Sequence, residues 1–123
     1  MLPVILNPIR LKTGLAGRGA PLVRRAALLA ESGIEARLLS PDVSDELLAP
    51  LQLLFVAGLD EGEARHLAAR ARDFGVLVNV EDVLPLCDFH APAIVRQGDL
   101  VLVKGSRGIG TDRVVERLKT ERA

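Results

Sequence analysis

The stretch LLFVAGLDEGEARHLAARARDFGVLVNV, residues 53–80, decides the fold of this chain. It opens with five consecutive apolar residues, 53–57, which is typical of a strand covered on both faces. Residues 63–74 then predict a helix, and Gly75 ends it. Its inward face is marked by apolar residues at helical spacing: Ala64, Leu67, Ala68 and Ala71. Residues 76–80 form a second buried-type strand, so the stretch predicts a parallel strand–helix–strand unit.

The same alternation extends toward the N-terminus. Residues 11–16 predict a first strand, which Gly14 weakens, and residues 34–39 predict a second. A helix begins near Pro21, whose missing N–H costs nothing in a first turn. Its expected inward face consists of Leu22, Ala26, Leu29 and Ala30, while Arg24, Arg25 and Glu31 are expected to face water. A short helix over residues 44–51 leads to the strand at 53–57.

The C-terminal part continues the pattern in a different form. Residues 93–95 and 100–103 predict two strands of a β-hairpin, and residues 114–119 predict a final helix. The complete order indicates a Rossmann-like α/β fold with a mainly parallel sheet flanked by helices, followed by this hairpin and helix. We expect residues 1–123 to form a single domain.

Composition narrows the functional classes. Hydrophobic residues make up 49% of the 123 residues but aromatic residues only 2%, so the core must be aliphatic. Sixteen basic residues balance sixteen acidic ones, and we therefore expect neither nucleic acid nor a membrane as partner. Neither a signal peptide nor an apolar run of the roughly 20 residues that span a bilayer is visible, which predicts a cytoplasmic protein. The single cysteine, Cys87, excludes an internal disulfide or a Cys-rich zinc site, and we predict no metal site.

The turn Gly17-Arg18-Gly19 falls between the first strand and its helix, where the pyrophosphate of a dinucleotide would dock. Glycines let the backbone approach the phosphates, but Leu22 replaces the third glycine of the G-x-G-x-x-G motif. Two interpretations stay open: a dinucleotide site, or a tight turn without a ligand. Asp42, just after Pro41, could likewise bind ribose hydroxyls or simply stabilise a turn.

Three further residues could carry chemistry. Asp82 follows the strand at 76–80 at the carboxyl edge of the sheet, where it could serve as a general base or be an ordinary loop carboxylate. His90 lies beside this loop and is the better candidate for a substrate ligand or proton carrier, or else has a structural role, whereas His66 is expected to be solvated. Cys87 is expected to be a small packed residue.

The segments NVED, residues 79–82, and LCDFHAPAIVRQGDL, residues 86–100, resemble the precorrin-2 dehydrogenase (siroheme synthase) family. The resemblance covers residues 2–100. It implies NAD-dependent oxidation of the tetrapyrrole precorrin-2 to sirohydrochlorin, followed in some members by iron chelation. It also implies a homodimer, because that family builds its substrate pocket between subunits.

The resemblance assigns roles to individual residues. It places Asp82 on the catalytic aspartate. It implies contacts with NAD at Ala20 and Pro21, beside the glycine turn, and again at Pro41 and Asp42. It places Ser106 on the tetrapyrrole side, where His90 is a second candidate contact.

Other features depart from that family. One strand of its usual order is missing between residues 39 and 53, and Ala57-Gly58-Leu59 stands in place of its A-T-D motif. Residues 98–123, with VLVKGSR at 101–107, instead resemble the C-terminal end of Mur ligases. Two hypotheses follow. The chain is an NAD-dependent dehydrogenase domain, or it is a recombined or engineered chimera that serves as a scaffold without native catalysis.

Overall fold

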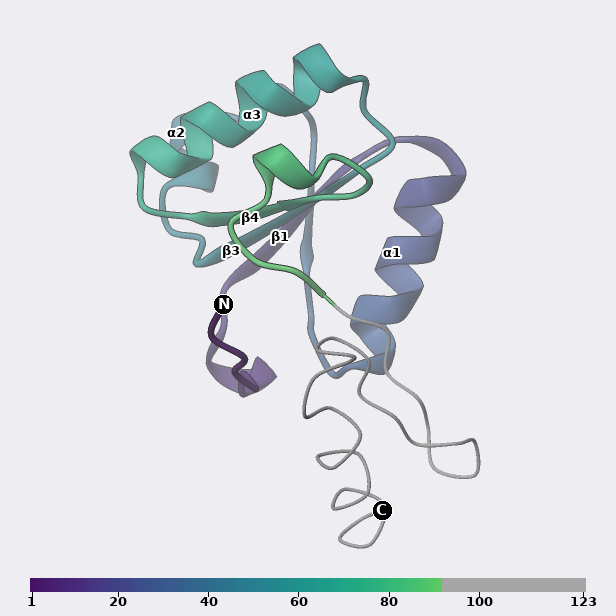
Figure 1. The fold of residues 1–123 in the computed structure, drawn as a ribbon, viewed down its shortest axis with the longest axis vertical. Coiled ribbons are helices and arrows are strands. Elements are labelled where there is room, and N and C mark those ends of the chain that lie inside the picture. The colour runs from purple at the N-terminus through teal and green to yellow at the C-terminus, as the bar shows by residue number, and fades with distance from the viewer. Residues whose placement is uncertain (92–123) are drawn as a thin grey trace, which may run out of the picture. The chain divides into compact units, whose positions relative to one another are not determined.

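A computed structural model describes residues 1–91 of the chain (Figure 1), and residues Met1–Phe89 form one compact unit. The predicted hairpin, the final helix, Ser106 and the Mur-ligase-like tail lie outside the described residues. The single-domain expectation, which includes them, therefore stays a prediction.

The core of the unit is a four-stranded parallel sheet. Its strands are β1 (Thr13–Gly17), β2 (Arg37–Leu39), β3 (Leu53–Ala57) and β4 (Leu77–Val80), in the spatial order β2-β1-β3-β4. All three pairings are parallel, which confirms the Rossmann-like α/β fold. The helices are α1 (Gly19–Glu31), α2 (Asp45–Leu48) and α3 (Glu61–Asp73), and single 3-10 turns form at Pro8–Arg10 and Leu84–Leu86.

Helices α2 and α3 cover one face of the sheet, and here the expected packing is confirmed (Figure 1). The four residues predicted to face inward from α3 are all buried: Ala64, Leu67, Ala68 and Ala71. They pack against Leu54, Val56 and Val78 of the strands. Helix α3 begins at Glu61, two residues before the predicted start, because the carboxylate of Asp60 caps it.

Helix α1 covers the opposite face less completely than its sequence suggests. Leu29 is buried and Leu22 is partly buried, but Ala26 and Ala30 are exposed, so half of the expected inward face is wrong. Arg25, expected to face water, is instead partly buried. Its guanidinium donates to Glu81 at 3.1 Å and lies 5.9 Å from the ring centroid of Phe55. The ion pair and the aromatic face stabilise the cation there.

Strand β2 is shorter than predicted, with three residues in place of the expected 34–39. It pairs with β1 only over Arg37–Leu39, opposite Gly14 to Ala16. Between β2 and β3 the chain forms only the four-residue α2, as expected if one strand of the usual order is missing. Within the described residues β2 is therefore an edge strand.

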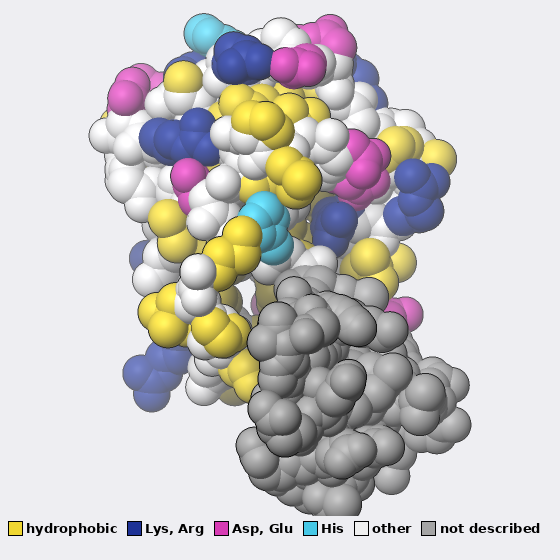
Figure 2. Space-filling view, in the orientation of Figure 1, with side chains coloured by type: hydrophobic (Ala, Val, Ile, Leu, Met, Phe, Trp, Pro, Cys, Tyr) yellow, Lys and Arg dark blue, Asp and Glu magenta, His cyan; other side chains and the backbone are white. Residues whose placement is uncertain are grey.

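The face of the described residues that Figure 2 shows carries no large region of one charge. On the face shown in Figure 2, Lys and Arg side chains are interspersed with Asp, Glu and hydrophobic ones. Among residues 1–91 no helix is long and apolar enough to cross a membrane.

Candidate functional site

The strand order places a crevice at the carboxyl ends of β1 and β3. The chain leaves β1 through α1 on one face of the sheet and leaves β3 through α3 on the other. Adjacent strands whose connections diverge in this way form a switch point, which is where open α/β sheets bind ligands.

Two glycine turns interlock at this switch point. The Arg18 N–H donates to the carbonyl of Ala57 at 3.1 Å. A Cβ on Gly17 would lie 1.6 Å from that same carbonyl oxygen, and a Cβ on Gly58 would lie 2.0 Å from the carbonyl oxygen of Arg18. Gly58 also has a φ of +84°. The close approach of the two turns therefore requires glycine at both positions.

The end of α1 that faces the crevice fits a phosphate group. The N–H groups of a first helical turn have no partner within the helix, and the helix dipole adds partial positive charge. Around Gly19, with φ +69°, a Cβ would meet nothing closer than the Pro21 ring at 3.6 Å. The predicted contact residue Ala20 is exposed, but Pro21 has no N–H to donate. The backbone of this turn is thus accessible to an anion, but the first turn of α1 has one N–H donor fewer than it would have without Pro21.

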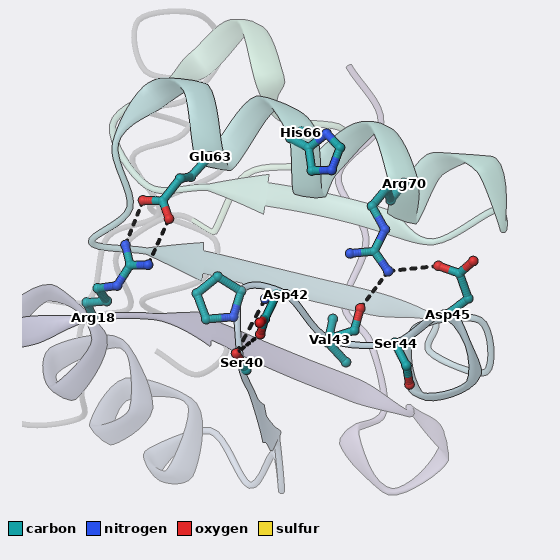
Figure 3. A pocket seen from close by; sticks show the side chains of 10 residues that line it. Arg18, Ser40, Asp42, Val43, Ser44, Asp45, Glu63, His66 and Arg70 are labelled. Carbon is teal, nitrogen blue, oxygen red and sulfur yellow. Dashed lines mark hydrogen bonds and ion pairs between the residues drawn. The ribbon is translucent and has the colours of Figure 1, made fainter.

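A pocket of about 730 Å³ extends from this turn between the segment after β2 and helix α3 (Figure 3). It is lined by Arg18, Ser40, Pro41, Asp42, Val43, Ser44, Asp45, Glu63, His66 and Arg70. The structure thereby brings the predicted contacts Pro41 and Asp42 into one pocket with the middle residue of the glycine turn.

Asp42 stands just after the carboxyl end of β2 with its carboxylate exposed. The hydroxyl of Ser40 donates a hydrogen bond to it, and this bond, with a backbone contribution, lowers the pKa of Asp42. The group is therefore an anionic acceptor at neutral pH, as recognition of ribose hydroxyls requires.

Arg18 does not project freely into solvent. Its two terminal nitrogens donate to the two carboxylate oxygens of Glu63 at 2.6 and 2.7 Å, so the pair is bidentate (Figure 3). The hydrogen bond from Arg18 lowers the pKa of Glu63 to about 2, and Glu63 in turn raises the pKa of Arg18. The pair joins the β1–α1 turn to the first turn of α3.

Three pocket residues on α3 were not singled out by sequence as site residues: Glu63, His66 and Arg70. These three residues are spaced so that they share one polar face of α3. The spacing is visible in the sequence, but it indicates a pocket only when α3 is known to lie beside the segment after β2. Arg70 donates to the carbonyl of Val43 at 2.5 Å and to Asp45 at 2.7 Å, which fixes that segment. His66, expected to be solvated, is exposed and lines the pocket.

Asp82 lies at a different strand end, beyond β4, and does not line this pocket. It is exposed and has a φ of +68°. The loop that carries it is held to β4, because the Cys87 thiol accepts from the Val80 N–H at 3.3 Å and Asp88 accepts from the Val78 N–H at 2.9 Å. Cys87 is thus a packed residue in a fixed loop.

The remaining predicted contacts are less defined. His90 is exposed, and its role as a substrate contact stays a prediction. In the described part of the chain, no group of three or more His, Cys, Asp and Glu side chains is arranged to hold a metal ion.

Comparison with known proteins agrees with this geometry. The family described as "Putative NAD(P)-binding" matches residues 4–93. Siroheme synthase of Nitrosococcus oceani is 28% identical over 87% of this chain and 27% of its own length. That of Stutzerimonas stutzeri is 32% identical over 76% of this chain and 24% of its own. A solved structure of SirC, precorrin-2 dehydrogenase, is 20% identical with a TM-score of 0.60, covering 98% of this chain and 71% of that one.

These comparisons support different conclusions. The SirC structure supports the fold, and the chain spans only about a quarter of the length of these siroheme synthases. The family match, in contrast, spans most of the chain. The chain therefore belongs to this NAD(P)-binding family and is similar to the N-terminal segment of siroheme synthases.

Proposed function

We propose that this chain binds NAD at the crevice between β1 and β3 and catalyses the oxidation of precorrin-2 to sirohydrochlorin. One observation carries the proposal: a single pocket at the switch point joins the glycine turn to a fixed carboxylate, Asp42. The names of the similar proteins, siroheme synthase and precorrin-2 dehydrogenase, supply the substrate class.

The residues around the pocket would hold the cofactor in a defined direction. The N–H groups of Gly19 and Ala20 at the start of α1 would bind the pyrophosphate, and Asp42 would accept hydrogen bonds from the adenosine ribose. The carboxylate also repels a 2′-phosphate, which favours NAD over NADP. When bound, NAD supplies an acceptor for one hydride.

The second hydrogen leaves the substrate as a proton, and Asp82 is our candidate base. It is exposed at the carboxyl edge of β4 and so is accessible to a large planar substrate. Its loop is fixed by Cys87 and Asp88, which keeps the carboxylate in one place. Iron chelation by the same carboxylate is a further proposal, as are Ser106 and His90 as tetrapyrrole contacts and a homodimer that completes the substrate pocket.

A second candidate is a cofactor-binding scaffold without turnover. The exposure of Asp82 favours it, since reacting groups usually lie in a cleft, and in the described residues the Asp82 side chain is exposed and lies outside the pocket. The chimera hypothesis belongs to this candidate.

Assay of NADH release on adding precorrin-2 under anaerobic conditions tests the proposal. Production of NADH together with sirohydrochlorin supports the dehydrogenase. Binding of NAD without formation of NADH and sirohydrochlorin supports the scaffold. If the chain neither binds NAD nor forms these products, the proposed function is wrong.

A further inference from the structure

The cation in the glycine turn is already paired in this structure. The Arg18 guanidinium lies against Glu63 through two hydrogen bonds of 2.6 and 2.7 Å. Both side chains retain solvent access, with 55% of Arg18 and 37% of Glu63 exposed. The pair is therefore open to exchange with a ligand.

The backbone of Glu63 is held in place independently of Arg18. Its backbone N–H donates to the Asp60 carboxylate at 2.8 Å, which caps α3. Because Glu63 sits in the first turn of a 13-residue helix, the helix dipole also favours its negative charge there. The backbone of Arg18 is also held, because its N–H donates to Ala57, but its side chain is the longer of the two, so the Arg18 guanidinium is the group more able to move.

A pyrophosphate and a carboxylate make the same demand on a guanidinium. Both are anions that accept two parallel N–H bonds from the edge of the arginine fork. Arg18 lies in the turn at the start of α1, where the pyrophosphate of a dinucleotide would dock. The edge that could clamp the phosphates is the one that Glu63 occupies.

We propose that Glu63 competes with the cofactor's pyrophosphate for Arg18 and thereby lowers the affinity of the chain for dinucleotides. The inference rests on the proposed function of the pocket and identifies an affinity-setting residue that faces the cofactor across the crevice. Breaking the pair releases Arg18 toward the ligand but leaves the negative charge of Glu63 nearby, which adds repulsion.

Glu63→Gln tests this inference, because glutamine keeps the size of the side chain and removes its charge. The affinity for NAD⁺, measured by isothermal titration calorimetry, should rise by roughly two- to fivefold, the upper part of the range of an exposed charge interaction. Glu61→Gln is the matched control. It removes the same charge from the same helical turn but breaks only the pair with Arg65, so the affinity should stay within about twofold of wild type.

A second variant shows whether the gain acts through Arg18. In Arg18→Ala the further change Glu63→Gln should raise affinity much less, since no guanidinium remains to be released. If wild type binds NAD⁺ and Glu63→Gln binds it equally or more weakly, this inference is wrong while the proposed function stands. If neither protein binds NAD⁺, both are wrong.

Discussion

Two strand ends at the same edge of the sheet differ in how much of a site they build. At the ends of β1 and β3, two turns interlock and a pocket opens beside Arg18 and Asp42. At the end of β4, Asp82 stands exposed on a fixed loop and lines no part of that pocket. Residues 1–91 therefore build the cofactor side of the proposed enzyme more fully than its substrate side.

The largest expected effect comes from a methyl group at the interlocked turns. Gly58→Ala places Cβ 2.0 Å from the Arg18 carbonyl oxygen at a φ of +84°, so the turns must separate. We expect a loss of about 3 kcal/mol in the free energy of unfolding, measured by urea denaturation, together with loss of NAD⁺ binding.

Gly75→Ala is the control for that change. Its φ of +79° is similar, but a Cβ there meets nothing within 4 Å, so only the backbone cost of about 1 kcal/mol should appear. Equal losses in the two variants would show that the close approach of the turns does not matter.

The next prediction tests whether the end of β4 serves turnover while the ends of β1 and β3 serve cofactor binding. Asp82→Asn should abolish turnover of precorrin-2 and leave NAD⁺ affinity unchanged, because Asp82 lies outside the cofactor pocket. Asparagine tolerates the left-handed φ of +68°, so stability should change by less than about 1 kcal/mol. Near-normal production of sirohydrochlorin by this variant would assign the base to another group.

A smaller effect concerns the choice of cofactor. Asp42→Asn keeps the shape of the side chain and loses the charge that repels a 2′-phosphate. We expect the ratio of NAD⁺ to NADP⁺ affinity to fall by roughly tenfold in calorimetric titrations. Asp45→Asn removes a charge from the same pocket, but from a carboxylate paired with Arg70, and should leave the ratio unchanged. A ratio that falls equally in both variants would contradict a specific role for Asp42.

The smallest effect is the pH dependence of the pair between the two turns. The pKa of Glu63 is lowered to about 2 from 4.5, so the pair stabilises the fold fully above pH 4.5 and is lost as the pH falls through about 2. The melting temperature of wild type should exceed that of Glu63→Gln by a constant amount near neutral pH, and the gap should close between pH 4.5 and 2. A gap that opens only above neutral pH would contradict this assignment.

The sequence predicted the structure well in segments where burial alone sets the residue pattern. The run at 53–57 is β3 without change, and the inward face of α3 follows from its four small or aliphatic residues. Strand β3 is buried on both faces of the sheet and α3 packs on the well-covered face, so burial decides the pattern in both segments. The same reasoning overestimated α1, because one helix covers the other face and contacts it mainly through Leu29 and Leu22.

The candidate site shows the limits of local patterns in another way. Pro41 and Asp42 could be placed near the glycine turn, because strand ends meet at one edge. The pairing of Arg18 with Glu63 joins residues 45 apart and left no local signal. The prediction for Arg25 was wrong for the same reason. Its partners are Phe55 in β3 and Glu81 just after β4, and only the assembled sheet brings them close to α1.

Titration of the full chain with NAD⁺, followed by the amide NMR spectrum, shows whether the cofactor binds at the ends of β1 and β3. We expect binding weaker than about ten micromolar, since Leu22 replaces a motif glycine and Arg18 is already paired. We also expect the amide shifts to concentrate at Gly19, Ala20 and Asp42. A saturating titration that leaves these amides unmoved, or that moves chiefly those of the Asp82 loop, would contradict this cofactor site.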